Sequence, residues 1–307
     1  MNLISIKNIT KKFDTIIAIN DVSIEINKGE MFAIVGADGA GKSTLIKMIC
    51  GINNPDVGDI TLFGLNFKKN RREIIKKIGY LSQKFSLYGD LTIDENIQFF
   101  AEVHGVKNYE KRRDELLEFT RLKKFRNRLA SKLSGGMKQK LALSCTLIHN
   151  PEILLLDEPT TGVDPVSRRD FWKILSNILH TGITIILTTP YLDEAERCHR
   201  VAMIDKGKIM KVDTPQNLKA SLNYGLYEIV CSDIQNAYSI IKNFGNIIEA
   251  QIFGDRIDIG LDNEEDLRLI EKLLIESGIE IISKRNIIPT LENIFISLLT
   301  KEKKTLQ

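Results

Sequence analysis

The chain has 307 residues, of which 43% are hydrophobic and 27% charged, and this length favours one large and one small globular domain. Its 43 basic and 40 acidic side chains leave a net charge of +3, which argues against a nucleic-acid partner held by a broad basic field. Four scattered cysteines form no C-x-x-C pair, which argues against a zinc site or disulfide framework and favours reduced thiols in a cytoplasmic protein.

The first part of the chain is predicted to consist of strands around a glycine-rich segment. Residues 4–13 and 21–30 alternate polar and apolar side chains, as strands with one buried face do. Residues 31–35, MFAIV, are apolar throughout and indicate a strand buried on both faces. Residues 42–50 have helical spacing, and Gly51 stands where a helix ends.

The middle of the chain alternates helices and strands. Residues 93–118 have a helical pattern, with a capping box from Thr92 to Glu95 and a stop at Gly105. Apolar strands follow at 152–157 and 183–189, separated by a helix that starts at Asp164-Pro165. Such alternation predicts an α/β fold with a largely parallel sheet and a helical insertion at about residues 85–150. No apolar run approaches the ~20 residues of a membrane span, so we expect any membrane role to come through a partner.

The order of predicted strands and helices changes after about residue 217. Strands at 226–231 and 280–287, a hairpin around Gly254-Asp255 and helices at 233–244, 264–277 and 290–299 follow one another. The helix at 264–277 has Asn263 as its expected cap. These elements predict a second, small α+β domain over residues 218–307, after a first domain over residues 1–217.

A phosphate-binding loop is predicted between the buried strand and the first helix. The motif G-x-x-x-x-G-K-[ST] is matched by Gly36, Ala37, Asp38, Gly39, Ala40, Gly41, Lys42 and Ser43, followed by Thr44. Glycines let backbone N–H groups converge on phosphate oxygens, and the helix N-terminus adds a favourable dipole. Lys42 is expected to reach the β and γ phosphates of ATP, and Ser43 to bind Mg²⁺.

Two carboxylates are predicted at the same edge of the sheet. Asp157 and Glu158 end the apolar strand 152–157, and ligands of parallel sheets bind at the carboxyl ends of strands. We expect Asp157 to hold Mg²⁺ through water and Glu158 to polarise an attacking water. By itself, an acidic pair after a strand is more often an ordinary loop start. Because the chain also has a phosphate-binding loop, we favour a functional role for this pair.

A second glycine-containing helix start, LSGGMKQ, spans residues 133–139. By itself, Ser134-Gly135-Gly136 is an ordinary helix cap with a flexible lead-in. Together with the phosphate-binding loop and the acidic pair, however, this segment closely resembles the signature of ABC transporter ATPase subunits. The resemblance covers residues 1 to about 215. It implies that Ser134, Gly135, Gly136 and Gln139 contact ATP held by a second copy of the chain, in a head-to-tail dimer.

The same resemblance implies roles for three further residues. Phe13 is similar in position to the aromatic residue that stacks on adenine, although it also reads as one more strand residue. Gln83, in IGYLSQ, resembles the glutamine that contacts Mg²⁺, takes part in catalysis and transmits motion to the membrane partner. Asp164, in TTGVD, resembles the aspartate of the segment called the D-loop and also reads as the cap of the following helix.

The chain departs from the family pattern at two places. Ala37 and Asp38 stand where the family usually has Pro-Asn, and the charge of Asp38 is expected to weaken nucleotide affinity if its carboxylate faces the phosphates. Pro190 stands where most relatives have a histidine that contacts the γ-phosphate. Proline offers no donor, but Thr189 and Pro190 resemble a helix cap and first helical residue. We expect the loss of one donor to slow turnover by about 10²-fold without abolishing it, with Thr188 or Thr189 as candidate replacement donors.

The resemblance implies an ATP- and Mg²⁺-dependent subunit that powers export of drugs, antibiotics, lipids or polysaccharides through separate integral membrane permeases. It would lie in the cytoplasm, at the inner face of the cell membrane. Two other classes compete with this one. A soluble ABC ATPase acting on ribosomes or DNA is disfavoured by the single phosphate-binding loop and the lack of a coiled-coil insertion. A weakly hydrolysing, ATP-gated regulatory subunit is suggested by Pro190 alone.

Overall fold

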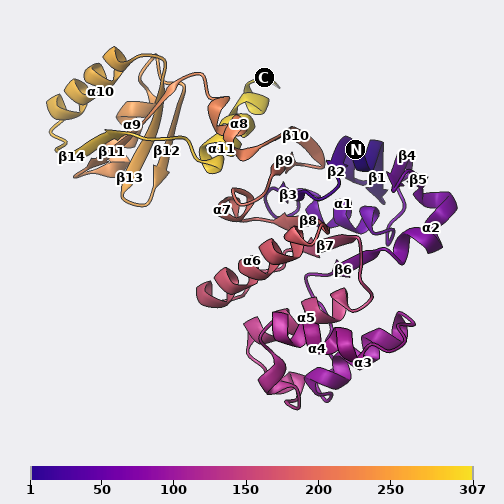
Figure 1. Ribbon diagram of the computed structural model, residues 1–307. Coiled ribbons are helices and arrows are strands. Elements are labelled where there is room, and N and C mark those ends of the chain that lie inside the picture. The colour runs from indigo at the N-terminus through magenta and orange to yellow at the C-terminus, as the bar shows by residue number, and fades with distance from the viewer. Residues whose placement is uncertain (1, 306–307) are drawn as a thin grey trace. The chain divides into compact units, whose positions relative to one another are not determined.

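The computed structural model describes residues 2–305, and the side chains of residues 2–300 (Figure 1). Its backbone contacts divide the chain into two compact units, Met1–Asp213 and Thr214–Gln307. The division lies four residues before the boundary predicted from the sequence. Within the part of the chain that the structure describes, no helix combines the length and the apolar character needed to cross a bilayer.

The first unit is built on two sheets. One is antiparallel and has the order β2-β1-β4-β5; its strands are β1 (Asn2–Phe13), β2 (Ile16–Asn27), β4 (Val57–Leu62) and β5 (Leu65–Asn66). The other has the order β10-β9-β3-β8-β7-β6; its strands are β3 (Met31–Val35), β6 (Ile78–Leu81), β7 (Ile153–Asp157), β8 (Thr184–Thr189), β9 (Arg200–Asp205) and β10 (Lys208–Asp213). All neighbours in the second sheet are parallel except β10, which pairs antiparallel with β9. The predicted α/β class is therefore confirmed.

The central strands of this sheet carry the site at one edge. Every residue of β3, β7 and β8 is buried, as expected for parallel strands covered on both faces. Val35 pairs with Thr189, and Asp157 pairs with Thr188, so the carboxyl ends of the three strands lie side by side. The loops that leave these strands therefore meet at this edge.

Some helices of the first unit lie against the parallel sheet, and others form a separate cluster. The helices of the first unit are α1 (Lys42–Ile49), α2 (Phe67–Ile75), α3 (Ile93–Val103), α4 (Glu110–Phe119), α5 (Gly135–Leu147), α6 (Pro165–His180) and α7 (Leu192–Ala195), with 3₁₀ turns at Lys123–Phe125 and Ala130–Lys132. Figure 1 shows α3, α4 and α5 grouped together. The capping box of α3 is confirmed: Thr92 Oγ1 accepts from Glu95 N–H, and the Glu95 carboxylate accepts from Thr92 N–H at 2.7 Å.

One local prediction is wrong. Thr189 and Pro190 do not start a helix, because Thr189 remains the last residue of β8, paired with Val35. Helix α7 begins only at Leu192, and its N-cap Tyr191 makes no side-chain capping bond. Pairing with the neighbouring strand holds Thr189 extended, and this tertiary contact overrides the local capping preference.

The second unit is a small α+β domain. Its elements are α8 (Pro215–Ala220), β11 (Gly225–Cys231), α9 (Ile234–Lys242), β12 (Glu249–Phe253), β13 (Arg256–Leu261), α10 (Glu264–Glu276), β14 (Ile281–Asn286) and α11 (Leu291–Thr305). The antiparallel sheet has the order β12-β13-β11-β14. This β-α-β-β-α-β order is that of a split β-α-β unit. Asn263 caps α10 by accepting from Asp266 N–H at 2.9 Å, as predicted.

The second unit has a hydrophobic core of its own, formed by one face of the sheet with α9 and α10. Leu274 on α10 is fully buried there, whereas its neighbour Leu273 is 39% exposed. We expect Leu274→Ala to lower the free energy of unfolding of this unit by about 2–5 kcal/mol through lost burial and a cavity. The matched change Leu273→Ala should cost less than about 1 kcal/mol. Calorimetry of the full chain checks both; equal losses would contradict an independent core.

Candidate active site

The loop between β3 and α1 approaches the backbone of neighbouring segments closely. A Cβ on Gly36 would lie 2.2 Å from the carbonyl oxygen of Ile204. Gly41 has φ +105°, and a Cβ there would lie 2.6 Å from the carbonyl oxygen of Ala18. Only glycine fits these two positions, so the loop stays tight and its backbone faces the adjoining cavity.

Lys42 is the first residue of α1, and its side chain is almost fully buried. It donates to the carbonyl oxygens of Gly36 at 2.9 Å and Ala37 at 3.1 Å, and its Nζ lies 3.3 Å from Glu158 Oε1. The Asp38 carboxylate is 3.8 Å from Lys42 Nζ, but the Asp38 side chain is 96% exposed. Water therefore screens its charge, and the weakening of nucleotide affinity expected from Asp38 stays a prediction.

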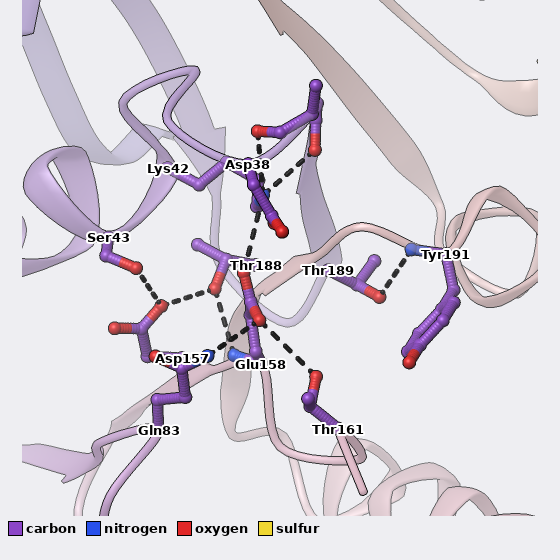
Figure 2. Close-up of polar contacts among 12 residues, drawn as sticks. Asp38, Lys42, Ser43, Gln83, Asp157, Glu158, Thr161, Thr188, Thr189 and Tyr191 are labelled. Atoms are coloured by element: carbon purple, nitrogen blue, oxygen red, sulfur yellow. Dashed lines mark hydrogen bonds and ion pairs between the residues drawn. The ribbon is translucent and has the colours of Figure 1, made fainter.

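Ser43, Asp157 and Thr188 form a second polar contact beside Lys42 (Figure 2). Ser43 Oγ donates to Asp157 Oδ1 at 2.9 Å, and Thr188 Oγ1 donates to the same oxygen at 2.7 Å. Asp157 is 2% exposed. Burial raises the pKa of the nearby Tyr80, and the charge of Asp157 raises it further. A hydroxyl beside a carboxylate is the oxygen donor set that Mg²⁺ takes when phosphates supply further ligands. Among residues 2–305, no cluster of three or more acidic, histidine or cysteine side chains forms a complete protein cage for a metal.

Glu158 is held in an unusual backbone conformation at the end of β7. Its φ is +48°, in the left-handed region, and its N–H donates to Thr188 Oγ1 at 3.0 Å. Glu158 Oε2 accepts from Gln83 Nε2 at 2.9 Å and from Thr161 Oγ1 at 3.3 Å. The carboxylate is thus directed toward Lys42 on one side and Gln83 on the other (Figure 2). Backbone strain of this kind is typical of functional sites.

Lys42, Ser43 and Glu158 line one cavity of about 890 Å³, large enough for a nucleotide, whereas Asp157 and Thr188 lie behind Ser43 and Glu158 and do not line it. It is lined by Ile16, Ile17, Ala18, Asp38, Gly39, Gly41, Lys42, Ser43, Thr44, Gln83, Glu158, Thr161, Pro190, Tyr191, Lys206 and Gly207. Sequence reasoning missed the apolar wall of Ile16 and Ile17, together with Tyr191 and Lys206. The only sequence signal for that wall was its position three residues after Phe13.

Phe13 lies outside this cavity. The residue ends β1, is 44% exposed, and has Lys11 Nζ 5.4 Å from its ring centroid. Its assignment as the residue that stacks on adenine stays a prediction, whereas the aliphatic side chains of Ile16 and Ile17 are in place on the cavity wall.

The segment at residues 133–139 does not contribute to the cavity of its own chain. Ser134 caps α5 by accepting from Met137 N–H at 3.4 Å, while Gly136 packs against Ser167, whose Oγ would lie 2.3 Å from an added Cβ. Asp164 caps α6 by accepting from Ser167 N–H at 2.9 Å, and this bond holds the pKa of Asp164 below its usual range. None of Ser134, Gly135, Gly136, Gln139 or Asp164 lines the cavity around Lys42.

The candidate replacements for a histidine at position 190 are already engaged. Thr188 Oγ1 donates to Asp157, and Thr189 Oγ1 donates to Glu194 Oε2 at 2.7 Å. Both threonines are buried, with at most 1% of either exposed. Pro190 lines the cavity but has no side-chain donor.

Comparison with known families and proteins shows what this chain resembles. The family model described as ABC transporter matches residues 19–161. The chain is 40% identical over 220 residues to the probable multidrug ABC transporter ATP-binding protein YbhF of Escherichia coli, a match that covers 71% of this chain but only 38% of that relative. It is 32% identical to the Nod factor export ATP-binding protein I of Burkholderia thailandensis, with 97% of each chain covered. It is 31% identical to the linearmycin resistance ATP-binding protein LnrL of Bacillus subtilis, with 96% of this chain and 98% of LnrL covered.

Solved structures agree with the fold of the first unit. A structure described as the ATP binding subunit of an ABC transporter matches with a TM-score of 0.64 and 28% identity, covering 71% of this chain and 92% of that one. The dimeric structure of MJ0796, a bacterial ABC transporter cassette, matches with a TM-score of 0.63 and 27% identity, covering 69% of this chain and 98% of that one.

Proposed function

The chain belongs to the ABC transporter family of ATP-binding proteins, and from this membership we propose that it hydrolyses ATP to drive export through a separate membrane permease. The observation that carries the proposal is the convergence of Lys42 and Glu158, 3.3 Å apart, in a cavity of nucleotide size. Ser43 and Asp157 meet 2.9 Å apart beside them. A phosphate-binding lysine, a divalent-cation site and a base in one cavity are the parts that phosphoryl transfer to water requires.

Each residue in or beside the cavity would have a separate role in ATP binding or hydrolysis. The loop from Gly36 to Thr44 would bind the phosphates through its backbone and through Lys42. Ile16 and Ile17 would contact the adenine ring of the nucleotide. Glu158 would accept a proton from the attacking water, and Gln83, which donates to Glu158, would hold that carboxylate in place. Ser43 would hold Mg²⁺ directly and Asp157 through water; the ion would neutralise charge on the β and γ phosphates.

A head-to-tail dimer would complete each site. Ser134, Gly135, Gly136 and Gln139 lie outside the cavity of their own chain, so a contact from them to ATP requires a second copy. Ser134 and Gly135 are exposed at the N-terminus of α5, where unpaired N–H groups favour an anion. The dimeric cassette among the similar structures supports this arrangement.

Relatives with export in their names support the direction of transport. Two relatives that match 97% and 96% of this chain are named for Nod factor export and linearmycin resistance, and these names support our proposal of export of a drug, antibiotic, lipid or polysaccharide. The permease partner would place the chain at the inner face of the membrane. Gln83 and the helical cluster α3–α5 would transmit the opening and closing of the dimer to it.

Pro190 is the one observation in favour of a second candidate, an ATP-gated subunit that barely hydrolyses. No specific observation favours a ribosome- or DNA-acting ATPase. Phosphate release by the purified chain, with and without its co-expressed permease, distinguishes a transport ATPase from these alternatives. Turnover well above that of Glu158→Gln, together with co-purification of the permease, is the expected result. Turnover equal to that of Glu158→Gln would favour the gated subunit, and failure to bind any membrane protein would argue against transport.

A further inference from the structure

The site has no hydrogen-bond donor at position 190, where the family pattern has a histidine. Pro190 lacks both a side-chain donor and an N–H group, and the hydroxyls of Thr188 and Thr189 are directed to Asp157 and Glu194. A terminal phosphate beside Lys42 would gain no hydrogen bond from any of these three residues. A donor from this segment must therefore come from another side chain that lines the same cavity.

Tyr191 meets this requirement. It lines the cavity together with Lys42 and Glu158, and it is half-buried. The Tyr191 hydroxyl has no hydrogen-bond partner among the side chains and backbone groups of residues 2–300. In Figure 2 the Tyr191 ring lies on the same side of Glu158 as Thr161, another residue that lines the cavity. A phenol O–H without a partner at the wall of a phosphate site is available to donate to an anionic oxygen.

Tyr191 is also held in a defined orientation. Its backbone N–H donates to Thr189 Oγ1 at 3.1 Å. The guanidinium of Arg168, on α6, covers the ring with its carbon 4.5 Å from the ring centroid, a cation–π contact. Arg168 in turn lies against a buried anion, since its Nε is 3.7 Å from Glu194 Oε1.

Glu194 anchors this arrangement to the sheet. It is 1% exposed, and its two oxygens accept from Thr160 Oγ1 at 2.5 Å and Thr189 Oγ1 at 2.7 Å. A buried carboxylate is costly unless it is paired and hydrogen-bonded, as this one is. Glu194 thereby links the loop after β7 and the end of β8 to Arg168, which in turn contacts the Tyr191 ring.

We propose that Tyr191 supplies the hydrogen bond to the terminal phosphate of ATP that Pro190 cannot make, with Arg168 and Glu194 as positioning residues. This inference rests on the proposed ATPase function. It predicts selectivity for ATP over ADP, because only ATP carries the phosphate that the phenol would contact.

The test is the pair Tyr191→Phe and Tyr109→Phe, assayed for ATP hydrolysis and for binding of ADP and a non-hydrolysable ATP analogue. Tyr191→Phe keeps the ring under Arg168 and removes only the hydroxyl. We expect kcat/KM for ATP to fall by about 10- to 100-fold, the value of one hydrogen bond to a charged group. Affinity for the ATP analogue should fall with it, and ADP affinity should stay within about twofold, which also shows that the variant is folded.

Tyr109→Phe is the matched control. Tyr109 also lies under an arginine, Arg113, whose guanidinium carbon is 5.8 Å from the ring centroid, but it precedes α4, away from the cavity. Its kinetics should equal those of the unaltered protein. If the unaltered protein hydrolyses ATP and Tyr191→Phe does so equally fast, the inference is overturned and the ATPase stands. If the unaltered protein binds no nucleotide, the proposed function itself fails.

The positioning role of Arg168 has a separate readout. Arg168→Gln should lower kcat/KM for ATP while leaving ADP affinity unchanged, and it should cause little further loss when Tyr191 is already phenylalanine. Arg168→Lys, which keeps the cation over the ring, should restore part of the rate. Losses from Arg168→Gln and Tyr191→Phe that multiply in the double variant would instead show that Arg168 does not act through Tyr191.

Discussion

Replacing Glu158 by glutamine is expected to lower kcat for ATP hydrolysis by about 10³-fold with ATP binding retained, because glutamine keeps the shape but cannot accept a proton. The change preserves an acceptor for Gln83 and Thr161, which both donate to Glu158 Oε2. It removes the charge 3.3 Å from Lys42 Nζ, so ATP affinity should rise slightly if it changes at all. Phosphate release and equilibrium nucleotide binding measure the two effects.

The chain offers a control on the same strand. Glu152 directly precedes β7 and Glu158 directly follows it, so the two carboxylates lie at opposite ends of one buried strand. Glu152 is exposed and pairs with Lys77 at 3.4 Å. Glu152→Gln should leave kcat within about twofold, since a surface ion pair contributes little. Equal losses in both variants would show that the rate depends on charge in general and that Glu158 is not the base.

A mixture of two inactive variants, Lys42→Ala and Ser134→Arg, is expected to recover ATPase activity that neither has alone. Lys42→Ala removes the phosphate-binding ammonium, and Ser134→Arg blocks the exposed start of α5. In a head-to-tail dimer of one variant with the other, one site combines an intact Lys42 with an intact Ser134 from the other chain. Random pairing makes half of the dimers mixed, each with one of two sites intact, so activity should reach roughly a quarter of the normal value.

The mixing experiment distinguishes contacts within one chain from contacts between chains. If Lys42 and Ser134 of the same chain formed one site, no combination of the two variants would contain an intact site, and the mixture would remain inactive. Each variant alone serves as the baseline. The melting temperature of Ser134→Arg should drop only slightly, because the lost capping bond contributes about 1 kcal/mol.

Much of the fold follows from local patterns of residues. The continuous apolar runs at 31–35 and 153–156 lie in fully buried parallel strands, and Thr92 and Glu95 form the capping box expected of them. The error at Thr189 has a tertiary cause. Its threonine-proline pattern favours a helix start, but pairing with Val35 in the sheet keeps it extended. Local preferences of about 1 kcal/mol yield to strand pairing and burial of this size.

For this protein, the amino-acid sequence by itself determined which chemical groups are available and at which strand ends they stand. The glycine loop, Lys42, Ser43 and the pair Asp157-Glu158 are recognisable because their spacing is set by the few residues of a strand-to-loop turn. Only the tertiary structure decided which of these groups meet. Ser43 and Asp157 are 114 positions apart in the chain, and the link from Glu194 through Arg168 to Tyr191 joins α7 and its N-cap residue to α6. Contacts of this kind depend on how the sheet aligns distant segments, so no local pattern of residues reveals them.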